Sequence, residues 1–175
     1  MSTWFRRSIP IRRRHLICSS RPFETHKTIV AGIGNIIRSD DGVGVHALRQ
    51  LQKDPRVPRD VTFLDAGTMG LELLGYVRDA TRLLLIDAVD VGKPVGTVVR
   101  MNGDELRGQP CGGSVHQLAV ADLITTLPLV SDPAPQIVLL GIQTASTQWG
   151  TVLSGPVEAA LESLVEAVIE ELSVS

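Results

Sequence analysis

Aromatic side chains are scarce in this sequence, because three Phe, two Trp and one Tyr make up 3% of its 175 residues. Proteins that bind single-stranded nucleic acid stack the bases on aromatic rings, so this class is disfavoured. Long apolar runs are lacking too: no stretch approaches the roughly eighteen consecutive apolar residues that a membrane-spanning helix needs. With 43% hydrophobic and 21% charged residues, the composition instead predicts one globular domain with an aliphatic core.

Cysteine is rarer still, with Cys18 and Cys111 as the only two. Two thiols so far apart in sequence do not indicate a disulfide framework, and their scarcity favours a reducing compartment. The basic amino-terminal segment has no apolar stretch of signal-peptide length behind it. We therefore expect a cytoplasmic protein, and we expect it to be a monomer.

Charge is unevenly distributed along the chain. The net charge is −2, yet residues 1–28 contain seven basic side chains and one acidic side chain. Residues 1–27 could be a targeting signal or an arm that binds anionic surfaces, or they could be a solvated extension. We expect the solvated extension. The sequence thus predicts a poorly ordered basic segment over 1–27 and a single α/β domain over 28–175.

From residue 28 onward, apolar runs of strand length alternate with helical patterns. This alternation is typical of a mostly parallel sheet with helices on both faces. A turn-rich segment at 90–96 predicts an antiparallel hairpin between the third and fourth strands, at a sheet edge. The expected fold is a three-layer α/β structure around a five-stranded, mostly parallel twisted sheet. The expected strands are 28–33, 61–65, 82–87, 97–101 and 136–142, and the expected helices are 43–51, 69–77, 117–126 and 157–172.

Carboxylates follow the ends of three predicted strands. Asp41 follows the first strand, Asp65 ends the second and Asp87 ends the third. Ligand sites in parallel sheets form outside the carboxyl ends of the strands, so these side chains are candidates for one site. The neighbouring Asp40 is interpreted as a helix cap, because a carboxylate is favourable near a helix start.

The Gly32-x-Gly34 turn after the first strand raises the alternative of nucleotide binding. A dinucleotide fingerprint needs a small residue three positions later, where this chain has Ile37. The carboxylates of Asp40 and Asp41 would also repel a pyrophosphate. A nucleotide-binding module therefore stays an alternative that phosphate affinity would support.

Converging carboxylates suit a cation, and one histidine could complement them. His116 lies in a glycine-rich loop that leads into a helix, whereas His46 is expected to be a surface or packing residue that points away from Asp41. Two carboxylates and an imidazole can hold a divalent ion such as Zn²⁺ or Ni²⁺ and leave positions open for water or substrate. Spacing alone does not distinguish a ligand set of Asp41, Asp87 and His116 from a chance arrangement of these residue types.

Five collinear blocks between about residues 28 and 172 resemble the hydrogenase maturation endopeptidases. These proteases trim the carboxyl-terminal extension from the large-subunit precursor of NiFe hydrogenase. The blocks are GIGNIIRSDDGVGVHAL (32–48), LDAGTMGLELL (64–74), LLLIDAVD (83–90), SVHQLAVADL (114–123) and GIQ…WG…LS..VEAAL (141–161).

The resemblance implies a hydrogenase-maturation-protease (phosphorylase/hydrolase-like) fold and an aspartic-type endopeptidase. It implies that Asp41, Asp87 and His116 contact metal and carry the catalysis. No intrinsic cofactor is implied: the trio recognises nickel already installed in the precursor, and zinc or cadmium could occupy the same site. The implied partner is the large-subunit precursor.

The loop Asp65-Ala-Gly67-Thr68 departs slightly from the Asp-Gly-Gly-Thr of many relatives. We expect Asp65, Gly67 and Thr68 to contact substrate; the alternative is a tight turn capped by Thr68. No zinc-protease helix, serine elbow or convincing cysteine nucleophile is present in the sequence. A non-catalytic assembly chaperone that senses nickel with the same trio stays open as a second function.

Overall fold

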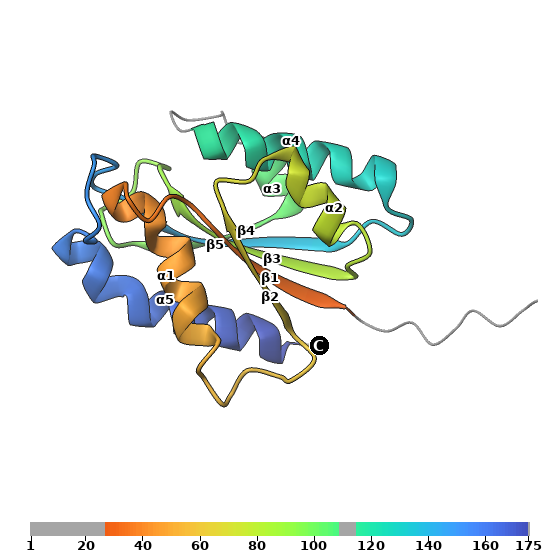
Figure 1. Ribbon diagram of the computed structural model, residues 1–175, viewed down its shortest axis with the longest axis horizontal. Coiled ribbons are helices and arrows are strands. Elements are labelled where there is room, and N and C mark those ends of the chain that lie inside the picture. Colours follow the sequence, from red (N-terminus) through yellow and green to blue (C-terminus); the bar gives the residue numbers. More distant parts are fainter. Residues whose placement is uncertain (1–26, 109–114, 175) are drawn as a thin grey trace, which may run out of the picture.

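The protein is built on a five-stranded sheet with the strand order β2-β1-β3-β5-β4 (Figure 1). A computed structural model describes residues 27–108 and 115–174, and the side chains of 27–108 and 120–174. β1, β2, β3 and β5 run parallel, and β4 runs antiparallel to β5 at one edge. The predicted α/β class is confirmed, whereas the predicted basic extension over 1–27 lies, apart from residue 27, outside the described residues. The strands are β1 (Thr28–Ile33), β2 (Thr62–Gly67), β3 (Arg82–Val89), β4 (Val98–Asn102) and β5 (Gln136–Gln143).

Helices cover both faces of the sheet, which makes three layers (Figure 1). On one face lie α1 (Val43–Leu51) and α5 (Gly155–Ser173). The other face carries α2 (Leu74–Val77) and α4 (Val115–Val130), together with the short α3 (Gly103–Gly108). Two 3₁₀ turns precede α1 and α2: η1 (Ser39–Gly42) and η2 (Leu71–Leu73). None of the helices within the described ranges is long and apolar enough to cross a membrane.

Burial explains why β3 occupies the middle of the sheet. Leu84 and Ile86 face the core shared with α1 and α5, while Leu83 and Leu85 face the core shared with α2 and α4. All four are fully buried, as expected for a strand with helices on both sides. Along β3, polar side chains therefore occur only towards the two ends of the strand, at Arg82 and Asp87.

The predicted antiparallel strand at a sheet edge is confirmed, but its predicted hairpin with the third strand is wrong. β4 pairs with β5, and β5 lies between β4 and β3. Seven of the eight residues of β5 are buried, so this strand needs neighbours on both sides. β4 has exposed positions at Arg100 and Asn102 and tolerates an edge. Adjacency along the chain suggested the hairpin, but burial decides the order of the strands.

Gly44 seats the first turn of α1 directly on two strands. A Cβ at this position would overlap the carbonyl oxygens of Ile33 and Ile86, which are backbone atoms that cannot rotate away. We expect Gly44→Ala to lower the free energy of unfolding by about 2 kcal/mol, as for other overpacked sites. Thermal unfolding should then show a melting temperature lower by roughly 4–8 °C.

Gly75 in α2 offers the matched control, because a Cβ there would have nothing within 4 Å. Gly75→Ala should keep or slightly raise the melting temperature, since alanine is the better helix former. A Gly44→Ala protein as stable as the wild type would contradict the seating of α1 on β1 and β3.

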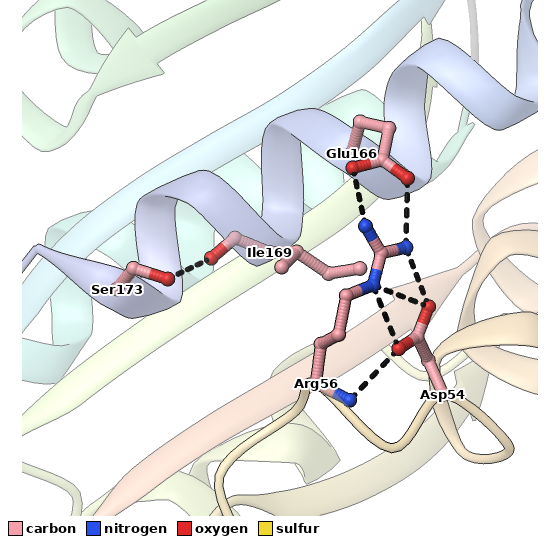
Figure 2. Close-up of polar contacts among 5 residues, drawn as sticks. All are labelled: Asp54, Arg56, Glu166, Ile169 and Ser173. Atoms are coloured by element: carbon pink, nitrogen blue, oxygen red, sulfur yellow. Dashed lines mark hydrogen bonds and ion pairs between the residues drawn. The ribbon is translucent and has the colours of Figure 1, made fainter.

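Arg56 connects the loop after α1 to α5, as Figure 2 shows. Its two terminal nitrogens donate to the Glu166 carboxylate at 2.8 and 2.7 Å, and its Nε donates to Asp54 at 3.0 Å. These hydrogen bonds from Arg56 lower the pKa of both carboxyls below their ordinary values. The cluster links the loop after α1 to α5. Because its groups are in contact with solvent, its contribution to stability is modest.

Candidate functional site

The parallel register places polar residues together at the end of the sheet where the parallel strands finish, which we call the carboxyl edge. Gly32 of β1 pairs with Asp65 of β2 on one side and with Ile86 of β3 on the other. Asp87 is the next residue of β3 and pairs with Gly141 of β5. Asp65 and Asp87 therefore lie at the same carboxyl edge, on opposite sides of β1, and the chain leaving β1 runs there into η1.

Asp41 lies in η1, which contacts β3. Its side chain is 4% exposed, and the Asn35 backbone N–H donates to its carboxylate at 2.9 Å. Asp87 is 2% exposed, and its carboxylate accepts a hydrogen bond from the Ala88 N–H at 2.8 Å. Burying a carboxylate is costly unless polar or charged partners compensate it. Two buried carboxylates thus lie at the same end of the sheet, where they are candidates for one site.

Asp87 belongs to the face of the sheet that α4 covers, since it alternates with Leu85 and Val89, which pack in the core shared with α4. At the far end of α4, the Ser131 hydroxyl donates to the Arg78 carbonyl at 2.7 Å, just before β3 begins. Sixteen residues of helix are about 24 Å long, which is comparable with β3. The first turn of α4 therefore reaches the carboxyl edge, on the same side as η1 in Figure 1.

His116 is the second residue of α4. Its side chain lies outside the described side chains, so its predicted meeting with Asp41 and Asp87 stays a prediction. Among the side chains that are described, no group of three His, Cys, Asp or Glu could hold a metal ion. Asp41 and Asp87 can supply carboxylate oxygens to a divalent ion, and a third ligand has to come from elsewhere.

The loop after β2 lies beside the loop after β1. The Gly34 N–H donates to the Gly67 carbonyl at 2.7 Å, and both glycines have positive φ angles, of 118° and 48°. Asp65 and Thr68 are exposed on this loop. The turn η2 that follows has no side-chain cap, so the alternative role of Thr68 as a helix cap is wrong.

Asp40 does not cap its own turn, which corrects the prediction made for it. It is completely buried, and it accepts hydrogen bonds from the backbone N–H groups of Ala145 (3.0 Å), Ser146 (3.1 Å) and Ser154 (2.6 Å). The Ser154 hydroxyl donates a fourth, at 2.9 Å. Asp40 thus fastens the segment between β5 and α5 to η1, and all of these partners are more than a hundred residues away in sequence.

Gln143 is a second buried polar residue at this edge that the sequence analysis missed. Its Oε1 accepts from the Val91 and Lys93 N–H groups at 2.8 and 3.2 Å, and its Nε2 donates to Asp90 at 3.0 Å. These bonds hold the loop between β3 and β4 against the carboxyl end of β5. A polar residue that ends the apolar run of β5 was the available signal.

A protein-family model described as hydrogenase maturation protease matches residues 45–171 of the chain. The chain belongs to the hydrogenase maturation protease family. A maturation protease of this family is a peptidase, and hence a hydrolase.

Curated relatives agree with this assignment. The hydrogenase expression/formation protein HupD of Bradyrhizobium diazoefficiens is 31% identical over 153 residues, which cover 86% of this chain and 80% of HupD. The hydrogenase 2 maturation protease of Escherichia coli K12 is 30% identical over 148 residues, covering 83% of this chain and 90% of that protein.

Solved structures agree as well. The hydrogenase maturating endopeptidase HybD from E. coli superposes with a TM-score of 0.76 at 30% identity, over 83% of this chain and 91% of HybD. The five-stranded mixed sheet of this maturation protease is therefore the fold of its family, and its carboxyl edge is where peptidase chemistry is to be sought.

Proposed function

We propose that this protein is the endopeptidase that removes the carboxyl-terminal extension from the nickel-loaded large-subunit precursor of a NiFe hydrogenase. Membership of the maturation protease family supports the proposal. The observation that carries it is the pair of buried carboxylates, Asp41 and Asp87, at the carboxyl edge of the sheet.

In this proposal Asp41, Asp87 and His116 contact the nickel of the substrate. The ion arrives with the precursor and is part of the substrate, so the protein needs no cofactor of its own, and zinc or cadmium could occupy the same position. Carboxylate and imidazole are ligands that suit nickel and zinc. A divalent ion between two carboxylates also lowers the electrostatic cost of keeping them in the interior.

Recognition and cleavage then use the same site. When the nickel is held, the scissile peptide bond lies beside it, and a water molecule activated by the metal or by a carboxylate attacks the carbonyl carbon. The C–N bond then breaks, and the amine of the released extension leaves with the proton taken from the water. Asp65, Gly67 and Thr68, on the loop hydrogen-bonded to the β1 turn, contact the polypeptide. Because the nickel brings the scissile bond to this site, cleavage is restricted to precursor whose metal centre is complete.

Intact-mass measurement tests this function. Purified protein is incubated with nickel-loaded and with nickel-free precursor from the organism that makes this chain. We expect the loaded precursor to lose the mass of its carboxyl-terminal extension and the nickel-free precursor to keep its mass. Equal cleavage of both would contradict nickel recognition, and a loaded precursor that is bound without any change in mass would indicate an assembly chaperone instead.

A further inference from the structure

Two segments at the carboxyl edge expose large apolar side chains. They comprise residues 36–38 and 147–152, and we call them the Trp149 platform. Trp149 and Val152 are 77% and 70% exposed, and Ile37 and Ile36 are 47% and 37% exposed. Large apolar side chains exposed on two neighbouring segments of a folded domain are typical of a binding site.

The two segments hold each other in place. The Ser39 N–H donates to the Gly150 carbonyl at 2.7 Å, and the Gly150 N–H donates to the Ile37 carbonyl at 3.0 Å. Arg38 donates through its Nε to the Thr147 carbonyl at 3.0 Å, and its guanidinium lies 5.7 Å from the centre of the Trp149 ring. The Trp149 platform is therefore a preformed surface, and a partner pays little ordering entropy on binding it.

Asp40 fixes the platform to the rest of the domain. Its buried carboxylate accepts hydrogen bonds from backbone N–H groups on both sides of the platform's second segment. The donors are Ala145 and Ser146 before the segment and Ser154 after it. The first segment is continuous with the candidate site, because the Asn35 N–H donates to the Asp41 carboxylate. A buried carboxylate thus orients a surface whose large apolar side chains are themselves exposed.

A peptidase must hold polypeptide on either side of the bond that it cuts, and the Trp149 platform directly adjoins Asp41. We infer that the Trp149 platform binds an apolar segment of the substrate polypeptide next to the scissile bond. The inference rests on the proposed function and extends it, because the platform supplies affinity for the polypeptide whereas the carboxylates deal with the metal. Buried aromatic anchors carry much of the energy in such interfaces, so Trp149 is the dominant contact.

Steady-state cleavage of nickel-loaded precursor, followed by intact mass, tests the inference. Trp149→Ala and Ile37→Ser should each raise KM about tenfold or more, while kcat at saturating precursor stays within about threefold of the wild type. Leu129→Ala is the matched control, because Leu129 is 82% exposed at the end of α4, at the opposite edge of the sheet. That control should leave both constants unchanged.

A binding measurement separates this inference from the proposed function. In an Asp87→Asn background, which should not cut, adding Trp149→Ala should weaken the Kd for nickel-loaded precursor about tenfold. If Asp87→Asn still cuts, the proposed role of Asp87 fails, and the KM comparison still judges the platform. Unchanged KM and Kd for both platform variants, an equal effect of Leu129→Ala, or a changed oligomeric state with unchanged KM would overturn the inference.

Discussion

Replacement of His116 by alanine should abolish cleavage of nickel-loaded precursor and leave the fold intact. His116 occupies the first turn of α4, where alanine is a good helix former, so the helix should persist. The imidazole is the proposed third contact to the substrate's nickel, next to Asp41 and Asp87. We expect the cleavage rate, measured by intact mass, to fall at least about a hundredfold, with an unchanged circular dichroism spectrum.

His46→Ala is the control for this experiment. His46 is half-buried on α1, and its pKa is lowered by burial and by the charge of Arg49, so it is a neutral packing residue at neutral pH. Its replacement should lower stability slightly without changing the cleavage rate per folded molecule. Unimpaired processing by His116→Ala would refute the assigned role of His116, whatever the control shows.

Asp40→Ala should cause the largest loss of stability among the substitutions that we consider. The substitution leaves the N–H groups of Ala145, Ser146 and Ser154 without their acceptor. Because these bonds are made to a fully buried carboxylate, we expect a loss of about 4 kcal/mol in the free energy of unfolding. Thermal unfolding should show a melting temperature lower by roughly 8–16 °C.

Two further variants make the Asp40 result specific. Asp40→Asn keeps one acceptor oxygen and should fall between the wild type and Asp40→Ala. Asp60→Ala removes an exposed carboxylate from the loop after α1 and should change the melting temperature by no more than about 2 °C. If Asp40→Ala and Asp60→Ala had the same melting temperature, Asp40 would not be the residue that holds the segment between β5 and α5.

The strands could be predicted from the sequence to within about two residues because their signal is local. β3 and β5 each contain a continuous apolar run of strand length, and turn residues lie beyond both strands, so the sequence indicated where each strand lies. The positions of Asp65 and Asp87 at one edge followed as well, because parallel strands align their carboxyl ends. Features that depend on residues close together in the sequence could therefore be predicted.

Features that depend on residues far apart in the sequence could not be predicted. β4 was assigned the wrong neighbour, because pairing with β5 depends on how deeply β5 must be buried. Asp40 was interpreted as a cap because its local context fits one, whereas its four hydrogen bonds all go to residues 145–154. The short α3 has no buried residue and hence no apolar periodicity to reveal it.

A crystal structure of the full chain soaked with Cd²⁺, with anomalous diffraction to locate the ion, tests the central claim most directly. Cadmium reports where the protein alone can receive a metal ion, without the precursor. We predict one strong anomalous peak at the carboxyl edge, ligated by carboxylate oxygens of Asp41 and Asp87 and by a ring nitrogen of His116. A His116 ring turned away from both carboxylates, with cadmium bound only at other residues, would contradict the account.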